Sequence, residues 1–408
     1  MNILLINHYA GSPEMGMEFR PYYMAKEWVK MGHVVTIIAG DYSHLRKTNP
    51  SVEHDFQEEE VDEIKYVWIK TGEYEGNGLK RAQTMFRFTR KLKKNVNHIV
   101  DQYHPDVVIA SSTYPLDTYP AQEIAKKANA KYIHEVHDMW PATLYEVGGM
   151  SRSNPFVKIL QKAEDSAYKH CDACVSLLPY AKEYMVEHGL KEEKFHWIPN
   201  GVVVEEWENP QPLPDEHQSA FAKLRKDEKF IVGYFGGHAL SNCLLPFIKA
   251  AELSSDETVH FVLVGDGTEK KELVHYAQEH KLQNVTFLPP VGKKAVPTLV
   301  ENFDCIYIGA KDSPLYRFGV CMNKMFDSMM AGKAIVFAIN APATPVTEND
   351  CGIVIKPENP EEIIQGIAEI KAMEPSDINQ MGLKGQQAIN TNFIYSKLAE
   401  DFIDVISN

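Results

Sequence analysis

Short apolar runs alternate with helix-length amphipathic segments along nearly the whole chain, in two consecutive series. This alternation is typical of parallel α/β folds, because neighbouring parallel strands need a crossover helix between them. The first series predicts strands at Ile3–Ile6, Val34–Ala39, Lys65–Ile69, Val107–Ala110, Tyr132–Val136 and Ala173–Leu177. The second predicts strands at Phe230–Phe235, His260–Val264, Val285–Leu288, Cys305–Ile308, Ala334–Phe337 and Gly352–Ile355. We therefore expect an α/β protein with two doubly wound sheets.

A proline-rich connection separates the two series. The segment Glu208–Pro214 holds three prolines, which suit a loop rather than a helix or a strand. We expect an N-terminal Rossmann-like domain over residues 1–205 and a C-terminal one over 206–392. A last helix is expected near Tyr395–Ile406, and the segment 393–408 can pack back on the first domain or stay with the second.

Charge and cysteine content exclude several classes of protein. The 408 residues carry a formal net charge of −14, so we expect no nucleic-acid partner, because phosphate neutralisation needs a basic surface. The six cysteines are sparse and lie in apolar surroundings, as buried thiols of a reducing compartment do. Cys171 and Cys174 have the spacing of half a metal or redox motif, but no second pair follows.

The chain has no stretch of about 18 apolar residues that could span a membrane. Its opening, Met1–His8, has no basic segment and reads as a buried strand rather than a signal peptide. The expected location is the cytoplasm.

Glycine turns follow the first two strands of the second series. Gly236 and Gly237 let the backbone approach a phosphate, although a tight structural turn explains them equally well. Gly265 follows the next strand, and neither turn supplies the Gly-x-Gly-x-x-Gly of a dinucleotide site. Val291 follows a third strand, where the backbone could contact a base edge or simply turn.

The segment from Tyr316 to Gly332 is the most informative. Arg317 and Gly319 lie in a loop before a helix that is expected to start near Asn323. Lys324 then lies in the first helical turn, where a cation opposes the helix dipole unless an anion binds there too. Asp327 follows one turn later and could accept hydrogen bonds from a ribose. The alternative is an exposed Lys–Asp pair.

Two features of the first half carry candidate site residues. His137 ends a buried strand, and Asp138 could orient its ring; period-two alternation directs His134 elsewhere, so a shared metal is not expected. The long loop His8–Arg20 contains Gly11 and Gly16, which could offer backbone N–H groups to a ligand, or it is a mobile surface loop.

Residues 79–96 hold seven Lys or Arg and no acid, with apolar residues interleaved. Such a basic amphipathic helix suits a membrane surface, into which it inserts its apolar face. It equally suits a solvated helix that packs its apolar stripe on the sheet. In the first case the protein is peripheral on the inner face of the cytoplasmic membrane.

The order of these features resembles family 4 glycosyltransferases of GT-B fold, in which two Rossmann-like domains face each other across a cleft. Within that family the chain looks most like bacterial transferases of O-antigen, lipopolysaccharide and capsule assembly, in the group that includes L-fucosamine transferases. The resemblance rests on Gly11–Gly16, Gly32-His33, His137-Asp138, Ile198–Gly201, Val264–Gly267 and Lys324–Gly332.

The resemblance implies retaining transfer from a nucleotide-sugar, most simply a UDP-sugar, to a saccharide or undecaprenyl-linked acceptor, with no metal and no cofactor. His137 would lie beside the donor sugar, Lys324 and the preceding loop would hold the diphosphate with Gly236 and Gly237, and Asp327 would bind the ribose. The acceptor side would include Gly11, Gly16, Arg20 and Asp138.

One departure from the family concerns Gly319, which stands where the family has a glutamate that contacts donor-sugar hydroxyls. We expect a different donor, such as a 6-deoxy or N-acetylamino sugar. The Arg and Lys that usually follow the phosphate turn are also missing, and Arg317 and Lys324 could replace them. A nucleotide-sugar epimerase, a phosphorylase and a non-catalytic scaffold of polysaccharide assembly remain alternatives.

Overall fold

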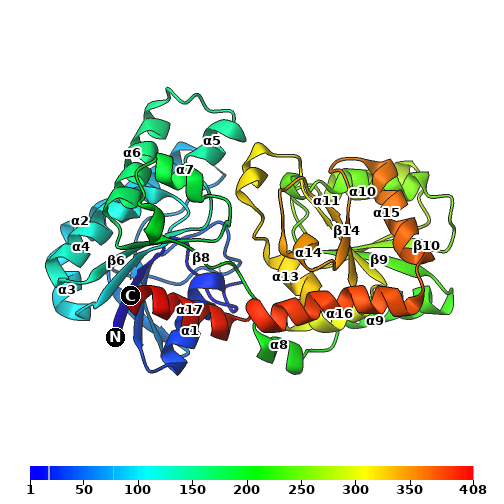
Figure 1. The fold of residues 1–408 in the computed structure, drawn as a ribbon, viewed down its shortest axis with the longest axis horizontal. Coiled ribbons are helices and arrows are strands. Elements are labelled where there is room, and N and C mark those ends of the chain that lie inside the picture. Colours follow the sequence, from blue (N-terminus) through cyan, green and yellow to red (C-terminus); the bar gives the residue numbers. More distant parts are fainter. Residues whose placement is uncertain (17–18, 77, 408) are drawn as a thin grey trace. The chain divides into compact units, whose positions relative to one another are not determined.

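The computed structural model describes residues 1–16, 19–76 and 78–407, and the chain forms two compact units (Figure 1). The first unit comprises Met1–Asn200 and Tyr395–Asn408, and the second comprises Gly201–Ile394. The division falls five residues before the predicted boundary at 205/206. The segment after it stays with the second unit because the Val202 backbone N–H donates to the Phe393 carbonyl at 2.8 Å.

The first unit is built on an eight-stranded sheet within the described residues, in the order β3-β4-β2-β1-β5-β6-β7-β8. Neighbouring strands are parallel except β3 and β4. The strand order reverses between β1 and β5, so the loops after these strands meet at a switch point. The strands are β1 (Asn2–Ile6), β2 (Val34–Gly40), β3 (Gln57–Val61), β4 (Ile64–Ile69), β5 (Val107–Ala110), β6 (Lys131–Val136), β7 (Ala173–Ser176) and β8 (Phe195–Trp197).

Helices lie on both sides of this sheet. The helices α1 (Phe19–Lys30) and α17 (Tyr395–Ser407) run side by side (Figure 1). Trp28 joins them, because its indole N–H donates to the Ala399 carbonyl at 3.2 Å and its ring lies 5.1 Å from Phe402. The other helices of the unit are α2 (Leu79–Lys94), α3 (Val96–Tyr103), α4 (Thr118–Ala128), α5 (Ala142–Glu146), α6 (Pro155–His170) and α7 (Lys182–Glu187).

The basic segment forms α2 and the start of α3, with a break at Asn95. Of its interleaved apolar residues, Met85, Phe88 and Leu92 are at most 2% exposed and pack inside the first unit, whereas Phe86 is 41% exposed. The three buried side chains have no surface to offer lipid, as expected for a helix that packs its apolar stripe on the sheet, whereas Leu79 and Phe86 remain exposed. Among the described residues, no helix is long and apolar enough to cross a membrane.

The second unit is built on a parallel sheet in the order β11-β10-β9-β12-β13-β14, and its switch point lies between β9 and β12. Every strand of the second series was predicted to within one residue at each end. The strands are β9 (Phe230–Phe235), β10 (Val259–Val264), β11 (Val285–Leu288), β12 (Cys305–Gly309), β13 (Ala334–Ala338) and β14 (Gly352–Val354).

Both faces of the second sheet are buried under helices, and successive residues of β9 alternate between the two cores. Ile231 packs in one core, beneath α9, α12, α13 and α16. Val232 packs in the other, beneath α10, α11 and α15. The chain thus has the two doubly wound α/β sheets that the sequence predicts. The helices of this unit are α8 (Val204–Glu208), α9 (Asp215–Lys226), α10 (Leu244–Leu253), α11 (Lys270–Glu279), α12 (Val296–Glu301), α13 (Asn323–Met330), α14 (Pro345–Glu348), α15 (Pro360–Ala372) and α16 (Pro375–Asn392).

Candidate functional site

A glycine turn ends β9 at the switch point of the second sheet. Gly236 has φ 124°, a conformation that favours glycine, and both Gly236 and Gly237 are exposed. The Tyr234 hydroxyl and the Asn242 side-chain amide both donate to the Gly237 carbonyl, at 2.7 and 2.8 Å. These two bonds fix the turn while its backbone remains accessible to a ligand.

Lys324, at the start of α13, is attached to the same turn. Its Nζ donates to the Tyr234 hydroxyl at 3.0 Å and to Asn242 Oδ1 at 2.5 Å. It also lies 4.8 Å from the centre of the Tyr234 ring. Burial lowers the pKa of Lys324 to about 7. Within the described residues it forms no ion pair, so a bound anion would stabilise its charged form.

Gly265 is required by packing between two turns. A Cβ there would lie 1.9 Å from the Gly236 carbonyl oxygen, and its φ of 154° disfavours other residues. Gly267 is similar, because a Cβ there would lie 2.4 Å from the His238 carbonyl oxygen. The turn after β10 therefore supports the glycine turn after β9, and this gives Gly265 a structural role.

Asp327 lies one turn after Lys324 on α13 and is only 5% exposed. Both of its carboxylate oxygens accept hydrogen bonds from Lys293 Nζ, at 2.7 and 2.6 Å. Lys293 begins the 3-10 helix η4 (Lys293–Ala295), just after the turn that contains the half-buried Val291. Lys293 was not singled out in the sequence, because nothing in its spacing relates it to a residue 34 positions away.

The loop before α13 includes the 3-10 helix η5 (Pro314–Phe318) and then Gly319, whose φ is 108°. Arg317 is exposed; its Nη1 donates to the Pro314 carbonyl at 2.6 Å, and its guanidinium lies 4.1 Å from the Phe318 ring centre. These contacts lie within its own short helix. Asn323 is exposed at the first position of α13.

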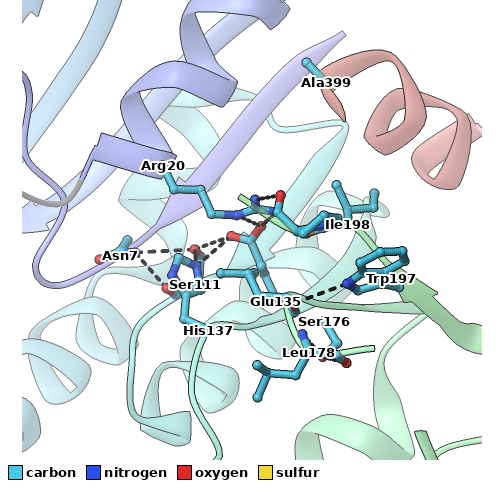
Figure 2. Close-up of polar contacts among 12 residues, drawn as sticks. Asn7, Arg20, Ser111, Glu135, His137, Ser176, Leu178, Trp197, Ile198 and Ala399 are labelled. Carbon is cyan, nitrogen blue, oxygen red and sulfur yellow. Dashed lines mark hydrogen bonds and ion pairs between the residues drawn. The ribbon is translucent and has the colours of Figure 1, made fainter. Parts of the chain in front are cut away.

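A second cluster lies at the carboxyl ends of β5 and β6 in the first unit. Figure 2 shows Arg20, Ser111 and His137 gathered around the buried carboxylate of Glu135. The Arg20 guanidinium holds Oε1 at 2.9–3.0 Å, and the Ser111 hydroxyl donates to Oε2 at 2.5 Å. Burial alone would raise the pKa of Glu135. The charge of Arg20 and the interactions with His137 and Ser111 outweigh it and hold that pKa well below its usual range.

Glu135 also determines the proton position on His137. Nε2 of His137 lies 3.0 Å from Glu135 Oε2 and 2.9 Å from Ser111 Oγ. Since the Ser111 hydroxyl proton is directed at Glu135, the ring must donate from Nε2, which leaves the Nδ1 lone pair of the neutral ring for another partner. The sequence suggested that Asp138 could orient this ring. Asp138 is exposed, and the bonds on the ring from the described residues come from Glu135 and Ser111.

Arg20 connects this cluster to the end of the first unit's main segment. Its guanidinium also donates to the carbonyls of Ile198, at 2.9 Å, and Pro199. In the preceding loop, Gly11 is buried and its carbonyl accepts from the Tyr66 hydroxyl at 2.8 Å. Gly16 has φ 89° and packs against the Lys47 side chain. Residues 17 and 18 of this loop lie outside the described residues.

Among the described residues, one cluster of a histidine and two acidic side chains has the spacing of metal ligands: Glu164, Asp165 and His188. Tyr168 and Tyr184 each donate to Glu164 at 3.0 Å, and Gln161 donates to both carboxylates. His188 Nδ1 also lies 2.8 Å from Asp165 Oδ1, so these residues form a hydrogen-bonded cluster in which only Glu164 is buried. All six cysteines are free, and Cys171 and Cys174 are buried.

Two protein families match the chain in succession. The model of Glycosyltransferase Family 4 matches residues 15–206, and that of Glycosyl transferases group 1 matches residues 216–387. The chain belongs to the GT-B glycosyltransferases of family 4. Among curated proteins it is similar to the putative colanic acid biosynthesis glycosyl transferase WcaI of Escherichia coli (strain K12), with 24% identity over 258 residues. That match covers 60% of this chain and 61% of the relative's length.

Solved structures share the fold over the full chain. Sucrose-phosphate synthase (tll1590) from Thermosynechococcus elongatus has a TM-score of 0.72 at 16% identity, over 99% of this chain and 97% of that one. Anabaena Alr3699/HepE, solved in complex with UDP and glucose, has a TM-score of 0.68 at 17% identity and complete coverage of both chains, 100% and 100%. These likenesses show the GT-B fold that the sequence predicted.

Proposed function

We propose that this protein is a retaining glycosyltransferase that moves a sugar from a UDP-sugar to a saccharide or lipid-linked saccharide. The observation that carries the proposal is Lys324: a half-buried ammonium without a carboxylate partner among the described residues, bonded to the residues that fix an exposed glycine turn. Its position at the switch point of a doubly wound sheet suits a ligand with a diphosphate. The putative transferase WcaI supports a role in making O-antigen, capsule or a related polysaccharide.

In the proposed reaction the bond between the anomeric carbon and the diphosphate oxygen breaks, and its electron pair leaves with the diphosphate. Lys324 and the backbone N–H group of Gly237 stabilise this charge, as donors of an oxyanion hole do. Gly236, whose own N–H donates to the Val264 carbonyl at 3.0 Å, contributes by leaving space for the phosphate. Arg317 adds positive charge from the neighbouring loop. The acceptor hydroxyl attacks the same face and loses its proton to the departing diphosphate, so the configuration is retained. No step requires a metal ion.

Further residues bind rather than react. Asp327 accepts hydrogen bonds from the ribose, and Val291, Gly319 and Asn323 line the nucleotide. Gly265 supports the glycine turn from below, since its own backbone groups are bonded to Leu288 and Lys270. His137 contacts the donor sugar, held in the required tautomer by Glu135. Because Gly319 stands in place of a sugar-binding glutamate, we propose a donor with fewer free hydroxyls, such as an N-acetylamino or 6-deoxy sugar.

The acceptor is proposed to bind to the first unit near Gly11, Gly16, Arg20 and Asp138. The exposed side of α2 adds a reason to favour a lipid-linked acceptor: Lys80, Arg87, Arg90, Lys93 and Lys94 are all exposed on a chain of net charge −14. Charge would attract anionic lipid to this face. Co-sedimentation with vesicles containing phosphatidylglycerol should fall when Arg90 and Lys94 are changed to Glu; unchanged binding would remove α2 from this role.

Binding and turnover test the proposal in two steps. A thermal-shift screen of nucleotides and nucleotide-sugars should show stabilisation that rises with the concentration of UDP and of the true donor. The best donor is then incubated with and without saccharide acceptors, in the presence of EDTA. We expect slow hydrolysis alone and transfer with an acceptor. Interconversion of the nucleotide-sugar without any acceptor would instead identify an epimerase, and a complete lack of nucleotide binding would favour a scaffold.

A further inference from the structure

Lys293 and Asp327 form an ion pair between two segments that lie beside proposed nucleotide contacts. Lys293 follows the turn after β11, and Asp327 lies on α13. On the same helix, Lys324 is bonded to the residues around the turn after β9. Two charged residues one turn apart on α13 thus connect to the carboxyl ends of β9 and β11, which are the edges where such sheets bind ligands.

The pair retains hydrogen-bonding capacity on both sides. Lys293 Nζ uses two of its three N–H groups on the carboxylate oxygens of Asp327, at 2.7 and 2.6 Å. Each carboxylate oxygen keeps a lone pair that can accept another bond. The pair therefore offers one donor and two acceptors within a few ångströms, which matches a vicinal diol, whose hydroxyls both donate and accept.

Burial is uneven in a way that suits ligand entry. The Asp327 side chain is 8% exposed and that of Lys293 is 24% exposed. An aspartate buried this far without a partner would be costly to fold and would repel a diphosphate bound near Lys324. Lys293 neutralises it while remaining accessible at the surface.

Resting on the proposed function, we propose that Lys293 is a specificity-determining residue that forms a composite ribose site with Asp327. The ribose 2′- and 3′-hydroxyls donate to the Asp327 oxygens, and the third N–H of Lys293 donates to one of them. The pair then selects ribonucleotide over deoxyribonucleotide donors, because a missing 2′-hydroxyl leaves polar groups of the pair without a partner.

The test compares nucleotide selectivity rather than affinity alone. Calorimetry measures the binding of UDP, GDP, their 2′-deoxy counterparts and inorganic pyrophosphate to the wild type, Lys293→Gln, Lys293→Arg and Lys294→Gln. Lys294 is the exposed neighbour and serves as the matched control. We expect Lys293→Gln to bind the ribonucleotide about tenfold or more weakly than the wild type does. The ratio of its affinities for the ribonucleotide and the 2′-deoxy form should fall towards one. Lys293→Arg should restore part of both, and Lys294→Gln should match the wild type.

Other outcomes separate the inference from the function it rests on. Pyrophosphate lacks the ribose, so it should bind equally to the wild type, Lys293→Arg and Lys294→Gln. Any loss of pyrophosphate affinity in Lys293→Gln measures the uncompensated charge of Asp327 alone, whereas the ribo-to-deoxy ratio measures the contact with the ribose. If Lys293→Gln keeps its melting temperature and its ribo-to-deoxy ratio, or if the wild type binds both forms equally, the composite site is wrong while nucleotide binding stands. If the wild type binds neither nucleotide, the proposed function fails. If Lys293→Gln does not fold, two other variants decide the question. A ribo-to-deoxy affinity ratio that stays above one in Lys293→Arg supports the composite site. A ratio that falls to one in a folded Asp327→Asn supports it as well, and a ratio that stays at the wild-type value there contradicts it.

Discussion

Nε2 of His137 lies 3.0 Å from Oε2 of Glu135, a carboxylate whose other oxygen is held by Arg20. Glu135 and His137 are two residues apart at the end of β6. Ser111, which directly follows β5, bonds to both. The ring is thus fixed in orientation and tautomer before any ligand binds. Such preorganisation suits the contact with the donor sugar that we propose for His137.

The first prediction concerns this orientation. Glu135→Gln keeps the size of the side chain but can donate to the ring, so the neutral His137 can take the other tautomer. We expect turnover to fall by about 10²-fold, as for a small misplacement of a contacting group, and His137→Ala to fall at least as far. Initial rates with the identified donor measure this, with Glu187→Gln, at an exposed site, as control. Turnover near the wild-type value in Glu135→Gln would show that the ring needs no such partner.

A second prediction concerns the stability of the Arg20–Glu135 pair, whose side chains are 5% and 3% exposed. Arg20→Met leaves Glu135 buried without its main counter-charge and should cost about 3–5 kcal/mol in the free energy of unfolding. Chemical denaturation, followed through the unfolding transition of the first unit, measures this loss of stability. A loss below about 1 kcal/mol, the range of exposed pairs, would mean that water reaches the carboxylate.

The pH dependence of this pair has a definite sign. The pKa of Glu135 is lower in the folded protein than in the unfolded chain, so its contribution is present above the unfolded value of about 4.3 and is lost as pH falls through the folded value. The wild type should therefore lose its stability advantage over Glu135→Gln on acidification below about pH 5. An advantage that stays constant down to pH 3 would contradict the pairing.

Much of the fold could be predicted from the sequence because buried parallel strands are short apolar runs. The two strands of the first sheet that were missed lack that signal. In β3 the residues Glu58, Glu59 and Glu60 are exposed, and β8 is only three residues long. Both lie at the edges of the sheet, where one side is left to solvent.

The candidate site was predicted less completely, for a different reason. Local patterns identified His137, Lys324 and Asp327, which follow strands or start a helix. The residues that complete their environment come from distant segments: Ser111 for His137, Tyr234 and Asn242 for Lys324, and Lys293 for Asp327. These partners are 26, 90, 82 and 34 residues away, and no local pattern relates residues over such distances. In α2, periodicity showed an apolar stripe but could not show what covers it.

The fourth prediction concerns proton uptake at Lys324. Its pKa of about 7 means that a large fraction is neutral near neutral pH, whereas a bound diphosphate favours the charged form and raises that pKa. UDP should therefore bind more tightly below pH 7 and lose affinity as pH rises to about 9, by at most tenfold per pH unit. Calorimetry in buffers of different ionisation enthalpy should detect the proton.

The controls for this prediction isolate the lysine. Lys324→Met should bind UDP weakly with little dependence on pH above 7, and Lys324→Arg should keep some affinity with little dependence, since arginine stays charged. The binding of uridine, which has no phosphate, should not depend on pH in this range. An equal slope in the wild type and in Lys324→Met would assign the proton to another group.

The last prediction concerns the support of the glycine turn. In Gly265→Ala the new methyl group would lie 1.9 Å from the Gly236 carbonyl oxygen, so one of the two turns must move, and the φ of 154° adds strain. We expect a loss of about 2 kcal/mol or more in stability and a weaker affinity for UDP, because the displaced turn carries Gly236 and Gly237. Gly292→Ala is the matched control: it lies in the same unit, a Cβ there meets nothing within 4 Å, and its φ is −65°. That variant should be as stable as the wild type or slightly more so. If Gly265→Ala kept both stability and affinity, the turn after β10 would not be what holds the proposed phosphate site in shape.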